Sequence, residues 1–320
     1  MKRTILIGLC AVVFGLTLDA SIVQAQPYPN RPIQLILPQP PGSALDTTGR
    51  LLAEELSKIL GVQVMPINKP GAAATLGTDQ AAKSKKDGYT IVYTNTSAMV
   101  YTRVHHPETV PYNPVKDFEP IGLHLFFPLV TSVQEGSPWK TFPELVEDAK
   151  KNPEKIRVGT SGQGSIDHFN VEIIQSLTGA KFTVIPFKAG QALIPALLGG
   201  HVEVTFDAFS QVLPHVGKLK MLLISRKMPD YPIPLITELG YKQGLLSAWY
   251  ALFAPAGVPE EVKVVLTRAF EKAAKNPNLK AKIEKLGFAV DYKPPQELRD
   301  LIVDDYERAM AIATRIGLRK

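Results

Sequence analysis

The chain has almost no cysteine and no apolar run long enough to cross a membrane. Its one cysteine, Cys10, lies in an N-terminal segment with two basic residues followed by the apolar run Thr4–Leu18. This run is shorter than the about 20 residues that a membrane-spanning helix needs, and the small residues of Val23–Ala25 form a cleavage site after it. We therefore predict a cleavable secretory signal peptide over residues 1–25. The mature chain would then hold no cysteine, which excludes disulfides and thiolate chemistry.

Dense clusters of one charge are also missing. The formal net charge is +6, and removal of residues 1–25 leaves 36 − 2 = 34 basic against 30 − 1 = 29 acidic residues, or +5. The basic residues are dispersed rather than gathered in the runs or helix faces that bind nucleic acid, so we expect no nucleic-acid partner. The remaining length exceeds that of a typical single core, which favours two domains.

Common catalytic and cofactor-binding motifs are absent. The segment Gly159–Gln163 does not match G-x-S-x-G, and Gly162–Asp167 lacks the third glycine of the dinucleotide fingerprint. There is no G-K-[ST] and no H-E-x-x-H. Ser165, Asp167 and His168 lie together at one helix start, a position that favours capping or ligand contact over a catalytic triad. We predict that the chain is not an enzyme and needs no cofactor and no metal.

What the sequence does contain is a pair of similar loops. Pro38–Arg50 and Val158–Phe169 each join an apolar run to a helix start through glycine and hydroxyl residues. Such a loop can direct the backbone N–H groups of the first helical turn at a bound group, with the helix dipole adding positive potential. Two such loops predict two lobes that close on one small anion, which points to a receptor rather than a catalyst.

Strands and helices alternate along the chain in two successive runs. The first run is expected to have strands at Pro32–Pro38, Val62–Ile67 and Thr90–Thr94 and helices at Ala44–Leu60 and Ala73–Lys83. The second is expected to have strands at Ile156–Thr160, Phe182–Pro186 and Val202–Phe206 and helices at Ile166–Thr178 and Gln191–Gly199. On the first helix, the inner side is expected to carry Leu51, Leu52, Glu55, Leu56 and Ile59. This rhythm predicts an α/β fold with largely parallel sheets and helices on both faces.

Two apolar, β-rich segments, Ile121–Val133 and Ser247–Pro255, are expected to cross between the lobes. The predicted first lobe comprises residues 26–126 and 247–320, and the predicted second lobe comprises residues 127–246. Because both crossovers are single extended strands, we expect the lobes to close by a hinge motion. Three further helices are predicted at Glu260–Lys275, Leu279–Leu286 and Pro295–Ile316.

In the predicted first lobe, Asp46 stands at the start of the helix. It could serve as N-cap or first-turn dipole partner, or it could contact a ligand directly. The two roles are compatible, since a carboxylate that ties down the loop would leave the N–H groups of Gly42, Ser43 and Ala44 for a ligand. The polar segment Thr94–Ser97 could be a simple turn, but it follows a strand at the carboxyl edge, where open α/β sheets bind ligands.

In the predicted second lobe, donors are expected from hydroxyl and amide side chains. These are Thr160, Ser161, Gln163 and Ser165. Lys188 is the only cation in these loops, and it could be either a surface residue or a ligand contact.

The chain resembles the periplasmic receptors of tripartite tricarboxylate transporters, often called Bug-type solute-binding proteins. The similarity covers essentially the whole mature chain. It includes YPNRPIQLILP, PGSALDTTGRLLAEELSKILGVQVMPINKPGAAATLGTDQAAKSKKDGYT, PYNPVKDFEPIG, VGTSGQGSIDH, PFKAG, LLGGHVEVTFD and SAWYALFAPAGVPEEV. The resemblance implies a two-lobed periplasmic-binding-protein fold with two crossover strands, and a small carboxylate held in the cleft between the lobes.

The resemblance also implies where the ligand is held. The family's first-lobe loop corresponds to Pro41–Asp46, and its second-lobe contacts correspond to Gly162–His168 and the segment ending at Asp207. Three departures fall here: Ser43 replaces a glycine, Gln39 replaces an aromatic residue, and Ala189 replaces the glycine after Lys188. The complete set of predicted ligand-binding residues is Gln39, Gly42, Ser43, Ala44, Asp46, Asn95, Thr96, Ser97, Thr160, Ser161, Gln163, Ser165, His168, Phe187, Lys188, Ala189 and Asp207.

These observations lead to one functional prediction and two alternatives. We expect a monomeric periplasmic receptor that delivers a small carboxylate to the membrane subunits of a tripartite transporter. The ligand could be an aliphatic acid, an amino acid or an aromatic carboxylate. The first alternative is a ligand sensor that presents its closed form to a membrane sensor kinase. An exported hydrolase is the second alternative, and the failed catalytic motifs disfavour it.

Overall fold

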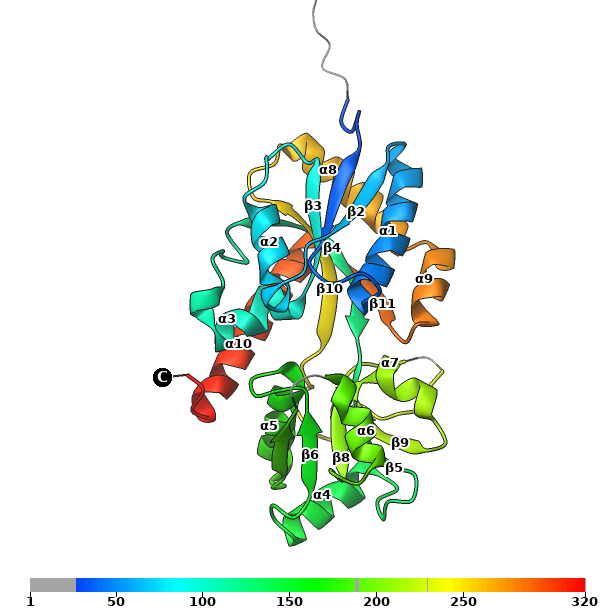
Figure 1. Cartoon of the computed structure of the whole chain (residues 1–320), viewed down its shortest axis with the longest axis vertical. Helices are drawn as coiled ribbons and strands as arrows, with labels where there is room; N and C mark the ends of the chain where they lie inside the picture. Colours follow the sequence, from blue (N-terminus) through cyan, green and yellow to red (C-terminus); the bar gives the residue numbers. More distant parts are fainter. Residues whose placement is uncertain (1–26, 188–189, 229, 320) are drawn as a thin grey trace, which may run out of the picture.

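The computed structural model describes residues 27–187, 190–228 and 230–319, which form two lobes, each built on one β-sheet (Figure 1). The predicted signal peptide lies outside the described residues. The first-lobe sheet contains, in spatial order, β11 (Ala289–Lys293), β4 (Phe118–Phe127), β10 (Ala248–Pro255), β3 (Thr90–Asn95), β1 (Ile33–Leu37) and β2 (Val64–Asn68). The second-lobe sheet contains β7 (Thr183–Pro186), β6 (Arg157–Thr160), β8 (Val204–Ala208), β5 (Leu129–Gln134) and β9 (Leu219–Ile224).

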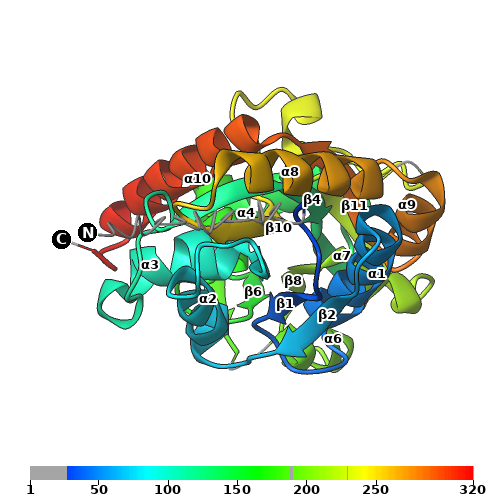
Figure 2. The same ribbon diagram turned by 90° about the horizontal axis from the view of Figure 1, so that it is seen from above.

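Helices cover both faces of the first-lobe sheet, as seen from above in Figure 2. One face packs on α1 (Ala44–Leu60), α8 (Glu260–Ala274) and α9 (Pro277–Glu284). The other face packs on α2 (Thr75–Ala82), α3 (Thr102–His105) and α10 (Pro295–Arg315). Alternation along the strands separates the two cores: Leu35 faces α1, whereas its neighbour Ile36 belongs to the opposite core.

The second lobe has the same three-layer plan. Its helices are α4 (Phe142–Lys151), α5 (Ile166–Thr178), α6 (Leu193–Leu198) and α7 (Phe209–Val212). Helices α4 and α5 pack on the sheet face that carries Val158 and Phe206. Short helical turns complete the chain at η1 (Ala72–Ala74), η2 (Ser97–Tyr101), η3 (Pro107–Thr109), η4 (Gly190–Ala192), η5 (Leu213–His215) and η6 (Ile236–Leu239).

The expectation of largely parallel sheets is wrong, because both sheets are mixed. In the first lobe β1 pairs parallel with β2 and β3, whereas β10 and β11 pair antiparallel with their neighbours. In the second lobe β6 pairs parallel with β7 and β8, while β5 runs antiparallel to β8 and β9. Strand β10 runs against the parallel strands of the first sheet, and β5 runs against those of the second. Strand β4 is antiparallel to β10 and therefore has the direction of β1, β2 and β3. Periodicity in the sequence indicates that a strand forms but does not set its direction.

Helix α1 begins and ends at the predicted residues. Ser43 caps its start by accepting the N–H of Asp46, and Gly61 ends it in the left-handed conformation. The predicted inner side is only partly right, because Leu51, Glu55 and Ile59 are half-buried. The buried stripe runs through Leu45, Thr48, Gly49, Leu52, Ala53 and Leu56. Helix α9 lies against the flank that carries Leu51 and Glu55, which explains their partial cover.

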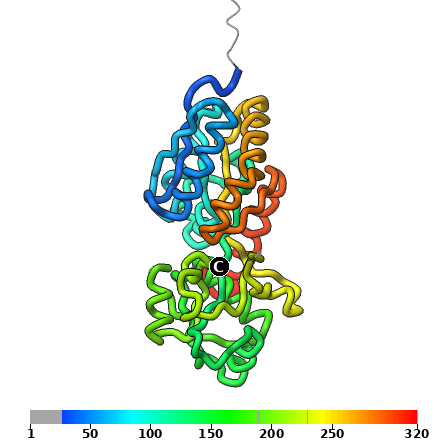
Figure 3. Tube along the Cα trace, turned by 90° about the vertical axis from the view of Figure 1, so that its right-hand side faces the viewer, coloured from blue at the N-terminus to red at the C-terminus, as the bar shows by residue number. Residues whose placement is uncertain are grey.

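The lobes lie one above the other and are joined by extended strands (Figure 3). Strand β4 of the first sheet continues through Pro128 into β5 of the second, and β10 returns to the first sheet. A buried pair of hydrogen bonds ties α5 to the segment before β10: the Asn170 side chain donates to the carbonyl of Leu246 and accepts its N–H. Helix α10 reaches the second lobe, where Arg315 donates to the Ser176 hydroxyl.

Candidate functional site

A cavity of about 250 Å³ lies between the two lobes. Its first-lobe wall consists of Asn95, Thr96, Ser97, Phe127, Ala248 and Tyr250. Its second-lobe wall consists of Leu129, Ser161, Ile166, Asp167, Gly190, Asp207, Ala208 and Gln211. The cavity lies where β3, β6 and β8 end, at the carboxyl edge of the parallel strands, which is where open α/β sheets bind ligands. The volume is below the about 300–1,000 Å³ of drug-sized sites, so it suits a small molecule.

The first-lobe wall is built where β3 turns into the helical segment η2. Asn95 closes the turn by accepting the N–H of Ala98 at 3.0 Å. The Thr96 hydroxyl accepts the N–H of Trp249 at 2.7 Å, which fixes the turn to β10. This hydroxyl is therefore occupied within the protein, although Thr96 lines the cavity. Tyr250 on β10 is buried against Tyr93 and Phe127.

In the second-lobe wall, the loop between β6 and α5 brings Ser161 to Asp167. The backbone N–H of Ser161 donates to one carboxylate oxygen of Asp167, and the Ser161 hydroxyl donates to the other at 2.8 Å. Burial raises the pKa of Asp167, and the hydrogen bonds from Ser161 oppose that change. Both oxygens of this buried carboxylate thus have partners inside the protein.

Asp207, at the end of β8, is only partly satisfied. The side chain is 6% exposed. Its Oδ1 accepts the N–H of Ala208 at 2.6 Å, but Oδ2 is buried and has no hydrogen-bond partner among the described residues. Burial, together with the nearby charge of Asp167, raises the pKa of Asp207 to about 7, against the smaller opposing effect of the Ala208 N–H.

The backbone of Gly190 lies against this pair of side chains. A Cβ at Gly190 would stand 3.8 Å from Asp207 Oδ1 and 3.9 Å from the Cβ of Ser161. The start of η4, the end of β8 and the β6–α5 loop therefore meet at one corner of the cavity.

The first predicted loop does not reach this cavity. None of Gln39, Gly42, Ser43, Ala44 and Asp46 lines it. The expectation that the loop's N–H groups are left for a ligand is wrong for two of the three, because Gly42 donates to Asp46 Oδ2 and Ser43 donates to the carbonyl of Pro40.

Asp46 is also not the N-cap of α1, since Ser43 holds that position. Arg50 and Asn68 donate to Asp46 Oδ1 at 2.9 and 2.8 Å. Although burial acts to raise it, these hydrogen bonds, with that from Gly42, hold the pKa of Asp46 below its ordinary value. Asp46 therefore organises the loop.

Of the remaining predicted residues, Asn95, Thr96, Ser97, Ser161 and Asp207 come together in the cavity. Thr160, Gln163, Ser165, His168 and Phe187 are not among its lining residues. Lys188 and Ala189 lie outside the described residues.

The predicted capping role at the start of α5 is confirmed for Ser165. Its hydroxyl accepts the N–H of His168 and donates to the carbonyl of Gly162. His168 Nδ1 accepts the N–H of Gly164 at 2.9 Å.

Several lining residues were not predicted to bind ligand. Asp167 belongs to the predicted second-lobe loop, for which capping or ligand contact was expected, but it was not in the predicted ligand-binding set. Its distance from Asp207 along the chain hid their proximity. Phe127 and Tyr250 lie on the predicted crossover segments. Because a crossover segment must pass beside the cleft, the ends of its strands could have been predicted to line the cavity. Phe127 and Tyr250 lie near such strand ends.

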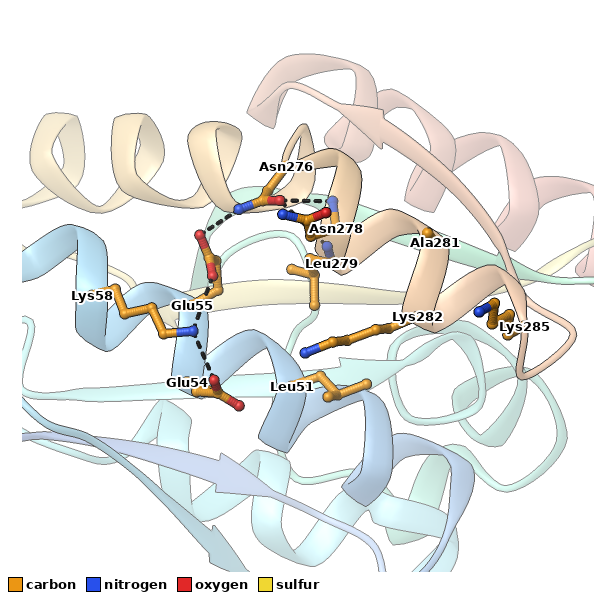
Figure 4. A pocket seen from close by; sticks show the side chains of 10 residues that line it. All are labelled: Leu51, Glu54, Glu55, Lys58, Asn276, Asn278, Leu279, Ala281, Lys282 and Lys285. Atoms are coloured by element: carbon orange, nitrogen blue, oxygen red, sulfur yellow. Dashed lines mark hydrogen bonds and ion pairs between the residues drawn. The ribbon is translucent and has the colours of Figure 1, made fainter.

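A second hollow, of about 440 Å³, lies on the first lobe between α1 and α9 (Figure 4). Among its charged side chains, Lys58 bonds to Glu54 and Glu55, and Asn276 donates to Glu55. Lys282 and Lys285 have no ion pair with another described residue. It is lined from one lobe only, so the cavity between the lobes is the better candidate site. Among the described residues, no helix combines the length and apolar character needed to cross a bilayer, and no cluster of His, Cys, Asp or Glu is placed to hold a metal ion.

Two mixed α/β lobes, with a cavity between them that receives polar groups from both, are the architecture of a two-lobed solute-binding protein. The family model described as "Tripartite tricarboxylate transporter family receptor" matches residues 48–318. The chain belongs to this family of periplasmic receptors.

Named relatives agree along nearly their full length. The chain is 30% identical to protein BugT of Bordetella pertussis, over 100% of this chain and 99% of that one. A solved TctC solute-binding protein from Polaromonas is 27% identical with a TM-score of 0.80, covering 90% of this chain and 99% of that chain. MatC from Rhodopseudomonas palustris, solved with bound malate, is 26% identical with a TM-score of 0.68, covering 89% and 99%. The predicted family and the two-lobed α/β fold are confirmed.

Proposed function

We propose that this chain is a periplasmic receptor that binds a small carboxylate between its lobes and delivers it to a tripartite membrane transporter. The observation that carries the proposal is the cavity of about 250 Å³ with polar groups from both lobes. A ligand that contacts both walls stabilises one arrangement of the lobes, and a membrane partner can recognise that arrangement.

Neutral donors are available for the carboxylate group. Asn95 and Gln211 carry amide donors and Ser97 carries a hydroxyl, and all three line the cavity. Hydrogen bonds from neutral groups to a charged acceptor are stronger than those between neutral groups. The malate bound in MatC gives a size reference, since that relative holds a four-carbon dicarboxylate in the same fold.

Export, oligomeric state and lobe boundaries are part of this proposal. The signal peptide over residues 1–25 is tested by mass spectrometry of the protein recovered from periplasm, which should begin at Gln26. The proposed lobes comprise residues 26–126 with 247–320 and residues 127–246. The end of β4 at Phe127 and the start of β10 at Ala248, each one residue from a proposed boundary, support this division. We expect a monomer by light scattering.

A thermal-shift screen tests the receptor function. The mature chain is heated with mono-, di- and aromatic carboxylates and amino acids, and sugars and divalent cations serve as controls. A ligand that binds only the folded state stabilises it by about 2.7 kcal/mol at a hundredfold excess over Kd, and this stabilisation raises the Tm. We expect at least one carboxylate to raise the Tm. A chain that responds only to sugars or cations would overturn the proposal.

A further inference from the structure

The cavity contains a buried acceptor that the protein itself leaves without a partner. Asp207 is 6% exposed, it lines the cavity, and its Oδ2 has no hydrogen bond within the described residues. A buried carboxylate oxygen without a donor is unfavourable, because desolvation removes its bonds to water. The second acidic residue of the cavity, Asp167, is a contrast, since Ser161 donates to both of its oxygens. Oδ2 itself is covered in this structure, so a ligand in the cavity supplies the missing donor once the carboxyl group of Asp207 turns toward it.

The charge of the cavity narrows the chemistry of that donor. Two buried carboxyl groups line one small cavity, and the described lining residues include no lysine, arginine or histidine. A ligand with negative charge at both ends would bring like charge to this corner, which is repulsive at low dielectric. An ammonium group supplies both a hydrogen bond to Oδ2 and a compensating charge.

We propose that the ligand of this receptor carries an ammonium group that donates to Asp207 Oδ2, so that the preferred carboxylates are amino acids rather than plain dicarboxylates. The inference rests on the proposed receptor function and specifies the ligand class of the same cavity. In this arrangement the amine lies at the corner formed by Asp207 and Gly190, and the carboxylate lies toward the amides and hydroxyl of Asn95, Gln211 and Ser97. The pKa of Asp207, raised to about 7 by burial and by Asp167, would fall when an ammonium group binds beside it.

The test uses ligands that differ at one substituent. Succinate, malate and aspartate share one carbon skeleton and carry hydrogen, hydroxyl or ammonium at the same carbon, and glutarate, 2-hydroxyglutarate and glutamate form a longer series. Titration calorimetry on the mature chain should give at least tenfold tighter binding for the amino member of one series than for its unsubstituted member. Losing a hydrogen bond to a charged group corresponds to a change of about ten- to hundredfold.

Three variants connect the preference to this carboxylate. Asp207→Asn keeps the shape of the side chain and replaces Oδ2 by an N–H donor. It should weaken binding of the amino member at least tenfold and leave binding of the unsubstituted acid unchanged. Asp305→Asn is the matched control, because Asp305 is also a buried carboxyl group but does not line the cavity. Lys188→Met removes a cation that lies two residues before Gly190 in the sequence, and it tests whether that cation contributes to the preference. The amino member should still bind more tightly than the unsubstituted acid in this variant.

Each other outcome has a definite meaning. If malate binds as tightly as aspartate, a neutral donor suffices and the inference is wrong. If succinate binds best and Asp207→Asn weakens it, Asp207 acts as a protonated donor to a carboxylate, which also overturns the inference but leaves the receptor function intact. If neither these probes nor any other carboxylate raises the Tm, the receptor function fails and the inference fails with it.

Discussion

Replacement of Asp207 by asparagine should remove a pH-dependent destabilisation of the fold. The folded protein holds the Asp207 proton up to a pKa of about 7, mainly because burial disfavours the charged form, whereas the group's ordinary pKa is 3.8. Between these values the folded state binds more protons than the unfolded state, so stability falls as the pH rises from about 4 to about 7. Each pH unit in that window corresponds to about 1.4 kcal/mol, so this one group costs the wild type about 3 kcal/mol between pH 5 and pH 8.

The assay is urea unfolding at pH 5, 6.5 and 8, followed by fluorescence of Trp139 and Trp249, which lie in different lobes. The quantity of interest is the difference in unfolding free energy between Asp207→Asn and wild type, because other titrating groups cancel in it. This difference should shift in favour of the variant by about 3 kcal/mol from pH 5 to pH 8. Asp305→Asn is the control. Burial raises the pKa of Asp305 to about 6, so the pH-dependent change in its unfolding free-energy difference should be smaller and should end nearer pH 6. A difference that does not change with pH for Asp207→Asn would refute the electrostatic account of this corner.

Two other predictions concern the first loop and the lobes. Asp46→Ala removes the buried acceptor to which Gly42, Arg50 and Asn68 donate. The unfolding free energy should fall by about 2–3 kcal/mol, while ligand affinity changes less than twofold. A large loss of affinity with little loss of stability would contradict this. Because the cavity is lined from both lobes, saturating ligand should reduce the radius of gyration in small-angle scattering, and an unchanged profile would argue against hinge closure.

The local structure of the chain was largely predictable. Helix α1 matches its predicted bounds, although Asp46 was the N-cap candidate and the caps are Ser43 and Gly61. Both are residue types that commonly start and end helices. The crossover β4–β5 was predicted because the segment Ile121–Val133 is apolar and β-rich, as a buried strand between two lobes would be. Strand direction was not predictable, since β10 reads the same whether it runs parallel or antiparallel to β3.

The site was predictable only where it follows a strand end. Asn95 and Ser161 were expected at the carboxyl edge, and both line the cavity. The first loop was expected to grip the ligand because its composition suits anion binding, but composition does not show that Asp46 already accepts the N–H of Gly42. The meeting of Asp167 with Asp207 depends on the packing of α5 against β8, which is a tertiary contact with no local signal.

The most direct test of the account is to fill each of the two hollows separately. Ala248→Trp places a large side chain in the cavity between the lobes, at a half-buried position at the start of β10, and Ala281→Trp does the same at the exposed groove between α1 and α9 shown in Figure 4. Both folded variants are compared with wild type by titration calorimetry, using the carboxylate or amino acid that raises the wild-type Tm most. Ala248→Trp should abolish measurable binding, whereas Ala281→Trp should retain the wild-type Kd within about twofold. Wild-type affinity in Ala248→Trp, or loss of binding in Ala281→Trp alone, would contradict the account.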